Sequence, residues 1–196
     1  MQGLVVQTLL EGTQGDFMEC GAYKGGVTIF WASIMKAYGV SRTVWVADSF
    51  AGLPDMSYMK REVGDATQAN HKGVKDQEHW VGLLEYNEDQ VRQNFRNFGL
   101  LGSNIKFLKG FFNDTLPTAP VTKLAFLRLD SDIYVSIYES LEFMYPKVSK
   151  GGYVLFDDWK LDYARQAVED YRRKHEITAE IKFLKGTIDP MAYWRK

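Results

Sequence analysis

Leu124-Ala-Phe-Leu-Arg-Leu-Asp130-Ser-Asp132 and Gly151-Gly-Tyr-Val-Leu-Phe-Asp157-Asp158 are the two stretches that decide the fold of this chain. We interpret each as a strand with an acidic end, and one helix separates them. In a parallel α/β sheet, two such strands lie side by side and end on the same edge, where ligands bind. The sequence therefore predicts a group of carboxylates at one edge of a parallel sheet.

This group of carboxylates favours a metal site. Carboxylates held together at a low dielectric constant repel one another strongly, and a hard divalent cation with oxygen ligands relieves the repulsion. A magnesium-type site is the first hypothesis. In the alternative interpretation, Asp132 caps the helix that follows it, and Asp157 and Asp158 lie in a solvated turn.

A glycine-rich segment lies upstream, between a predicted strand at 16–20 and a predicted helix at 27–38. Its spacing is Glu19-x-Gly21-x-x-x-Gly25-Gly26, which departs from the Gly-x-Gly-x-x-Gly fingerprint and lacks the Gly-Lys-Ser/Thr ending of a phosphate loop. NAD and ATP are therefore disfavoured. Glycines allow a ligand to approach the backbone closely, and an acidic strand end suits an ammonium group or a ribose hydroxyl. The alternative is a tight turn without a ligand.

A second acidic strand end follows in Val44-Trp-Val-Ala-Asp48-Ser49. Nucleotide-binding folds place a carboxylate that holds the ribose hydroxyls at about this distance from the glycine loop. Asp48 is thus the candidate ribose ligand. Its alternative role is to open the turn that Gly52 and Pro54 continue.

Apolar periodicity predicts an alternating α/β domain without repeats or a domain linker. The expected helices cover residues 2–11, 27–38, 87–98, 133–144 and 161–175, and the expected strands cover 16–20, 43–48, 105–108, 124–130, 153–157, 180–184 and 192–195. Residues 110–117 are expected to be a loop. Residues 55–83 break the rhythm, and we interpret them as an insertion near the mouth of the ligand site.

Five blocks of sequence occur in order along the chain. They are Glu19-x-Gly21-x-x-x-Gly25-Gly26, Val44-Trp-Val-Ala-Asp48-Ser49-Phe50-x-Gly52-Leu53-Pro54, Gly110-x-Phe112-x-Asp114-Thr115-Leu116-Pro117, Leu127-Arg128-Leu129-Asp130-x-Asp132-x-Tyr134-x-Ser136 and Gly151-Gly152-Tyr153-Val154-x-x-Asp157-Asp158. Together they resemble the macrocin O-methyltransferase (TylF) family. The resemblance implies a class I enzyme that depends on S-adenosylmethionine and Mg²⁺ and methylates a small-molecule hydroxyl, typically on a sugar of a natural product. It also implies a Rossmann-like α/β fold with a mostly parallel seven-stranded sheet whose last strand is antiparallel.

The resemblance also implies roles for individual residues. The metal ligands would be Asp130, Asp157 and Asp158, and the general base would be Asp130 or Asp132, which the sequence does not separate. The donor would lie along Glu19, Gly21, Lys24, Gly25, Gly26 and Asp130, with its ribose on Asp48 and Ser49 and its adenine near Gly110, Phe111 and Phe112. A bound Mg²⁺ would lower the pKa of the acceptor hydroxyl, and a carboxylate would take the proton.

The acceptor contacts are expected among aromatic and histidine side chains near the insertion and the last acidic strand end. The candidates are Tyr58, His79, Trp80 and Trp159. In this interpretation residues 55–83 form a mobile acceptor-binding segment outside the core. The alternative is that the aromatic residues pack the insertion onto the domain.

Composition restricts the classes of partner. The chain has 196 residues, 45% hydrophobic and 25% charged, which suits one domain over 1–196 with one substantial core. A net charge of -1 without a basic stripe argues against nucleic acid. The sequence shows neither an apolar run of about 20 residues nor a secretory signal, so no membrane partner is expected. The single cysteine, Cys20, cannot form an internal disulfide, which fits the cytoplasm.

The family resemblance further implies a homodimer. Family members usually have a longer N-terminal arm that helps to cover the substrate, so a chain beginning shortly before Gly15 implies a more open pocket unless a segment has been removed. Two alternatives stay open at this point. One is a methyltransferase for a phenol or catechol acceptor, and the other is a non-catalytic domain that binds a nucleoside cofactor.

Overall fold

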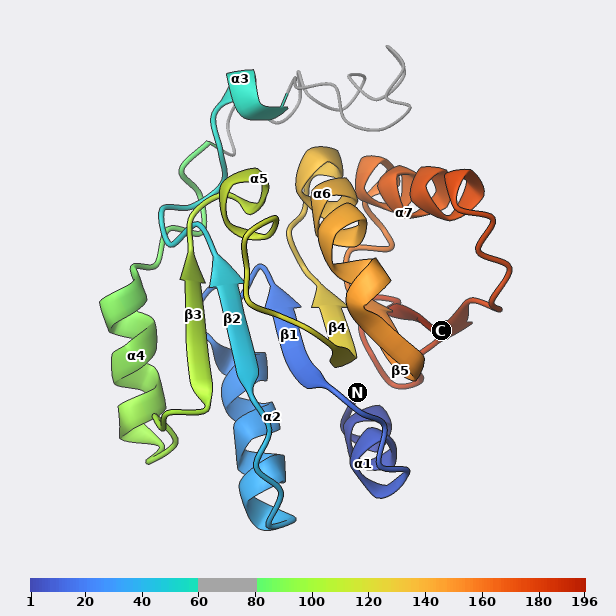
Figure 1. Cartoon of the computed structure of the whole chain (residues 1–196). Coiled ribbons are helices and arrows are strands. Elements are labelled where there is room, and N and C mark those ends of the chain that lie inside the picture. Colours follow the sequence, from blue (N-terminus) through green and yellow to red (C-terminus); the bar gives the residue numbers. More distant parts are fainter. Residues whose placement is uncertain (60–80) are drawn as a thin grey trace.

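The computed structural model describes residues 1–59 and 81–196, and its centre is a seven-stranded sheet (Figure 1). The strands are β1 (Asp16–Cys20), β2 (Val44–Asp48), β3 (Ile105–Lys109), β4 (Leu124–Leu129), β5 (Val148–Phe156), β6 (Lys182–Phe183) and β7 (Ala192–Arg195), in the order β3-β2-β1-β4-β5-β7-β6. Strands β1 to β5 pair in parallel, whereas β7 is antiparallel to both β5 and β6. The expected sheet, with its antiparallel last strand, is confirmed.

Helices cover both faces of this sheet. They are α1 (Gln2–Leu10), α2 (Gly26–Ala37), α3 (Met56–Met59), α4 (Glu88–Asn97), α5 (Phe112–Thr115), α6 (Tyr134–Met144) and α7 (Asp162–Lys174). Side chains of α1, α2 and α4 share one buried apolar cluster, and side chains of α5, α6 and α7 share another. Figure 1 shows α6 and α7 together beside β4 and β5, and α4 beside β3.

Successive side chains of a strand point to opposite faces of the sheet, so each central strand contributes to both apolar clusters. On β1, Phe17 belongs to the cluster of α1, α2 and α4, whereas Met18 and Cys20 belong to the opposite one. A strand that is covered on both faces needs apolar residues at successive positions, and this explains why the buried positions of the central strands are apolar apart from Glu19 of β1 and Arg128 of β4. Cys20 is buried in this way and serves as a small core residue.

Most helix and strand boundaries lie within two residues of the predicted ranges, although β6 covers only Lys182–Phe183 of the predicted 180–184. The helix α3 and a 3₁₀ helix at Tyr145–Lys147 were not predicted. Residues 110–117 contain the short helix α5, and β5 begins at Val148, earlier than the predicted strand. Asn87 caps α4: its side chain accepts a hydrogen bond from the Gln90 backbone N–H, and the Gln90 side chain accepts one from the Asn87 N–H. In the part of the chain that the structure describes, every helix is too short or too polar to cross a membrane.

The start of the 55–83 segment is packed rather than detached. Tyr58 and Met59 of α3 are buried against Ile133 and Val135, and the Tyr58 hydroxyl donates a hydrogen bond to Glu139 on α6. The expectation that the segment lies outside the core is therefore wrong for these residues, because their side chains are apolar enough to join α6. Residues 60–80 lie outside the described residues, and with them the predicted acceptor contacts of His79 and Trp80.

Candidate active site

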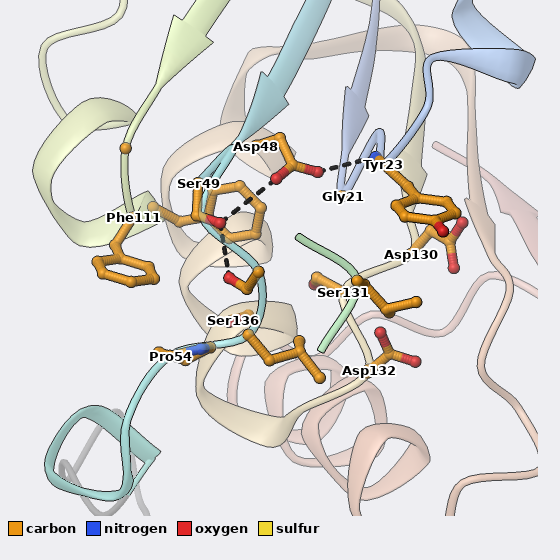
Figure 2. A pocket seen from close by; sticks show the side chains of 15 residues that line it. Gly21, Tyr23, Asp48, Ser49, Pro54, Phe111, Asp130, Ser131, Asp132 and Ser136 are labelled. Carbon is orange, nitrogen blue, oxygen red and sulfur yellow. Dashed lines mark hydrogen bonds between the residues drawn. The ribbon is translucent and has the colours of Figure 1, made fainter. Parts of the chain in front are cut away.

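A pocket opens at the carboxyl edge of the sheet, next to the ends of β1 and β4 (Figure 2). The chain leaves β1 toward β2 and β3 and returns to β4 on the other side, so the strand order reverses here. Ligands of open α/β sheets bind at such a reversal. The lining residues are Gly21, Tyr23, Asp48, Ser49, Gly52, Leu53, Pro54, Leu84, Gly110, Phe111, Phe112, Asp130, Ser131, Asp132 and Ser136.

The first glycine loop is pressed against the end of β4. Gly21 has φ +91°, and a Cβ atom at this position would lie 1.7 Å from the carbonyl oxygen of Asp130. The backbone N–H of Asp130 donates to the carbonyl of Cys20 at 2.9 Å. The loop after β1 and the acidic end of β4 are therefore in direct contact, and only glycine fits between them.

Asp48 joins the same loop to the end of β2. Its Oδ2 accepts hydrogen bonds from the backbone N–H groups of Ala22, at 2.8 Å, and Tyr23, at 2.9 Å. Its Oδ1 accepts one from the Phe50 N–H at 2.8 Å. Burial raises the pKa of Asp48, and these hydrogen bonds act against the rise. The carboxylate lines the pocket and at the same time fixes the glycine loop (Figure 2).

Asp48→Ala is expected to weaken binding of the donor by about tenfold and to lower the free energy of unfolding by about 2–3 kcal/mol, since three backbone amides lose a charged acceptor. Calorimetric titration with S-adenosylhomocysteine and thermal denaturation would measure the two effects. Asp16→Ala is the matched control, because Asp16 accepts from the Trp45 indole N–H at the opposite edge of the sheet. Equal donor affinity in both variants would contradict a ligand role for Asp48.

The predicted group of carboxylates is present, and a buried arginine lies within it. Arg128 of β4 has a 4% exposed side chain that contacts Glu19 Oε1 at 2.5 Å, Asp157 Oδ2 at 2.7 Å and Asp130 Oδ2. Burial acts to lower the pKa of this guanidinium, but the three carboxylates raise it above its usual value. Arg128 is therefore charged and compensates part of the negative charge at the strand ends.

Asp132 and Asp158 complete the group beyond the reach of Arg128. The backbone N–H of Asp132 donates to Asp158 Oδ2 at 3.1 Å. Burial, then repulsion from Asp130 and Asp157, raises the pKa of Asp132 to about 6. Burial, then repulsion from Asp132 and Asp130, raises the pKa of Asp158 to about 8. Burial and mutual repulsion therefore disfavour the ionised forms of Asp132 and Asp158, and a bound cation would lower both pKa values.

The alternative interpretation of these residues does not match the structure. The N-cap of α6 is Ile133, without a side-chain cap, so Asp132 does not cap this helix. Asp132 has φ +59°, a left-handed conformation that aspartate tolerates better than most residues. Asp157 and Asp158 are largely withdrawn from solvent and make the contacts given above, unlike residues of an open turn.

The carboxylate oxygens at this edge are the ligand type that a hard cation prefers, although, in the part of the chain that the structure describes, no three of them point to one common position. Asp157 Oδ1 is buried and has no hydrogen-bond partner among the described residues. Five carboxyl groups, those of Glu19, Asp130, Asp132, Asp157 and Asp158, are grouped with the single guanidinium of Arg128, and burial raises the pKa of Glu19 and of Asp158 to about 8. Within residues 1–59 and 81–196, however, no three acidic, histidine or cysteine side chains are grouped as ligands of one metal ion. Arg128 instead binds one oxygen of Asp130 and one of Asp157.

The other predicted site residues fall into two groups. Gly110, Phe111, Phe112 and Ser49 line the pocket as expected. Glu19, Lys24, Gly25 and Gly26 lie outside its lining: Glu19 is 1% exposed and bound to Arg128, and Gly25 is the left-handed N-cap residue of α2, which Gly26 begins. The Lys24 ammonium lies over the rings of Tyr23 and Tyr86.

Two predicted acceptor contacts have packing roles in the structure. Trp159 lies edge-on to Phe156 and to Phe183, with ring centroids 6.0 Å and 5.4 Å apart, and does not line the pocket. Tyr58 packs against Phe111 with centroids 4.9 Å apart. Phe111 itself lines the pocket, so Tyr58 supports the pocket wall from behind.

Sequence reasoning missed Arg128 and several lining residues. The missed lining residues are Tyr23, Gly52, Leu53, Pro54, Leu84, Ser131 and Ser136. A signal for Arg128 was present, because an arginine inside an apolar run that is predicted to be buried needs a counter-charge. Ser136 had a weaker signal, as a small polar residue near the start of the helix after Asp132.

Comparison with known proteins identifies the family. The profile of the family described as Macrocin-O-methyltransferase (TylF) matches residues 1–196. The chain belongs to the macrocin O-methyltransferase family. It is an O-methyltransferase, and the class I methyltransferase fold implies S-adenosylmethionine as the donor.

Curated O-methyltransferases resemble the chain over most or all of its length. The chain is 41% identical over 196 residues to the 8-demethyl-8-(2,3-dimethoxy-alpha-L-rhamnosyl)-tetracenomycin-C 4'-O-methyltransferase of Streptomyces olivaceus, covering 100% of this chain and 71% of the relative. It is 43% identical over 185 residues to the demethyldecarbamoylnovobiocin O-methyltransferase of Streptomyces niveus, covering 93% of this chain and 66% of the relative. The chain thus spans roughly two thirds to three quarters of these relatives' lengths.

Solved structures of methyltransferases share the fold of the chain. The O-methyltransferase NovP matches with a TM-score of 0.86 and 40% identity over 99% of this chain and 76% of that chain. The calicheamicin methyltransferase CalS11 has a TM-score of 0.68 at 22% identity, over 97% of this chain and 75% of that chain, and supports the fold.

Proposed function

We propose that this enzyme transfers the methyl group of S-adenosylmethionine to a hydroxyl group of a small molecule, with Mg²⁺ at the acidic strand ends. The observation that carries the proposal is one pocket that joins the glycine loop and Asp48 to Asp130 and Asp132. A donor and an acceptor can meet there because the two sets of residues share a single opening. The sulfonium donor is already activated, so the chain has to align the acceptor oxygen and receive its proton.

The donor would lie across the first three strand ends. Asp48 and Ser49 face the pocket where ribose hydroxyls would bind, and Gly110, Phe111 and Phe112 offer backbone and aromatic surface for the adenine. Gly21 brings the donor close to Asp130 because a side chain there would block the approach. Glu19, Lys24, Gly25 and Gly26 would shape the loop that holds the methionine portion.

Asp130, Asp157 and Asp158 would hold the Mg²⁺. The buried, unpartnered Oδ1 of Asp157 and the excess of carboxylates support this ligand set. A bound cation would act as a Lewis acid: it would lower the pKa of the acceptor hydroxyl and hold that hydroxyl in place. The chain contributes acidic ligands on adjacent strands and a buried environment around them.

Asp132 is the better candidate for the general base. It lines the pocket and has no contact with Arg128, whereas one oxygen of Asp130 is bound to Arg128. Its pKa, raised to about 6, lies close to neutral pH, where a carboxylate accepts a proton most effectively. Asp130 would then act as a ligand and Asp132 would receive the acceptor proton.

The acceptor is proposed to be a sugar hydroxyl of a natural product. The name of the Streptomyces olivaceus relative places its methyl group on a rhamnosyl unit, and a third relative, from Micromonospora griseorubida and 39% identical, is named mycinamicin III 3''-O-methyltransferase. Leu53, Pro54 and Leu84 give the pocket an apolar side that suits one face of a sugar ring. A homodimer, implied by the family, and a cytoplasmic location, which suits a single buried cysteine, are part of the same proposal.

Chelation tests the metal, and donor titration tests the cofactor. Turnover is expected to stop in EDTA and to return with Mg²⁺, and S-adenosylhomocysteine is expected to raise the Tm by mass action while NAD does not. Asp158→Ala should lose activity far more than donor affinity. Full turnover after exhaustive chelation would refute the metal role, and binding of NAD without S-adenosylhomocysteine would refute the donor.

A further inference from the structure

Arg128 occupies a position that the chemistry of methyl transfer does not by itself require. Its guanidinium binds acidic side chains from the ends of three adjacent strands: Glu19 on β1, Asp130 directly after β4 and Asp157 directly after β5. A guanidinium presents its donors in a rigid planar fork, so it fixes the direction of each carboxylate as well as its charge. An arginine that is 4% exposed can maintain this arrangement without competition from water.

The contacts divide the oxygens of each carboxylate. Arg128 Nη1 binds Asp130 Oδ2, and Nη2 binds Asp157 Oδ2 at 2.7 Å. The second oxygen of Asp157 is buried and accepts no hydrogen bond from a donor among the described residues, although the Asp157 carboxyl group lies within hydrogen-bonding reach of Asp130. Asp130 reaches the pocket with 30% of its side chain exposed. Each carboxylate therefore places one oxygen on the arginine, and this contact fixes the direction of the other oxygen.

We propose that Arg128 is a positioning residue that binds one oxygen of Asp130 and one of Asp157 so that their second oxygens stay available to the divalent cation. Glu19 also holds the guanidinium, through the same nitrogen Nη1 that contacts Asp130, at 2.5 Å. This inference rests on the proposed function, because it concerns the same metal site. In this proposal Glu19 acts by holding Arg128 in place, which accounts for a buried glutamate that does not line the pocket.

The charge of Arg128 and its geometry affect cation binding in opposite directions. A nearby positive charge repels a divalent cation, whereas correctly oriented ligands favour one. The proposal requires that the gain in Mg²⁺ affinity from oriented carboxylates exceeds the loss from the positive charge of Arg128. Lysine separates the two effects, because it retains the charge and loses the fork that engages several carboxylates at once.

Arg128→Lys is therefore the decisive variant. We expect Mg²⁺, titrated calorimetrically in the presence of S-adenosylhomocysteine, to bind about 10–100-fold more weakly than to the wild type, the range found when a residue that orients metal ligands is lost. The affinity for S-adenosylhomocysteine should change less. Arg165→Lys is the matched control, since Arg165 lies on α7, is 33% exposed and contacts Asp162 and Glu169 away from the pocket.

Each outcome bears on the proposal. Unchanged or tighter Mg²⁺ binding by folded Arg128→Lys would overturn it, because Arg128 would then be structural or a competitor of the cation. If the wild type binds S-adenosylhomocysteine but no Mg²⁺, the metal part of the proposed function fails, and this inference fails with it. If Arg128→Lys does not fold, Glu19→Gln replaces it: a several-fold loss of Mg²⁺ affinity is expected from the weakened anchor, and unchanged affinity would overturn the proposal.

Discussion

Asp132→Asn is expected to lower kcat by about 10²–10⁴-fold, the contribution of one general base, while the affinity for S-adenosylhomocysteine stays within a few-fold. Asparagine has nearly the same shape and tolerates the left-handed backbone of this position, so the variant removes the proton acceptor without disturbing the loop. Steady-state kinetics and calorimetric titration would measure the two quantities. Asp162→Asn, at an 84% exposed position on α7, is the control.

The pH profile gives the same prediction a second readout. A general base works when ionised, and burial together with Asp130 and Asp157 raises the pKa of Asp132 to about 6 in the metal-free protein. The ionised fraction falls as the pH falls through this value, so kcat/KM of the wild type should decline on the acidic side. A bound cation would move the decline to lower pH. An Asp132→Asn variant with near-normal kcat would transfer the base role to Asp130.

The strand ends could be predicted from sequence because their signals are local. Largely apolar runs that end in acidic residues identify buried parallel strands, and the topology then brings Asp130 and Asp157 to one edge, as the structure shows. The glycine loop and Asp48 were found in the same way, from residue type and position after a strand. For these elements, the residue types along the chain are enough to predict which residues lie at the ligand-binding edge of the sheet.

The contacts that organise the site could not be predicted, because they join residues far apart in the chain. Arg128 meets Glu19, which lies 109 positions away. Tyr58 meets Glu139 across 81 positions, and this contact makes the start of the 55–83 segment part of the packed structure. Neither periodicity nor residue type states which buried polar groups will pair, since the pairing depends on the relative placement of separate elements.

Gly21→Ala is expected to lower the free energy of unfolding by on the order of 3 kcal/mol and to weaken binding of S-adenosylhomocysteine by more than tenfold. The added methyl group would lie 1.7 Å from the carbonyl oxygen of Asp130, and alanine disfavours φ +91°. The loop after β1 must then move away from the end of β4, which separates the proposed donor loop from the proposed metal ligands. Thermal denaturation and calorimetric titration would measure both losses.

Gly3→Ala is the control for this prediction. Gly3 lies within α1, and a Cβ atom there would have no neighbour within 4 Å among the described residues, so alanine should keep or slightly raise the Tm. If Gly21→Ala behaved like Gly3→Ala in both measurements, the Asp130 carbonyl group would have to move away from the added methyl group with little loss of stability. The close approach of β1 and β4 would then not fix the geometry of the site, and the donor would have to be oriented by Asp48 and the loop after β3.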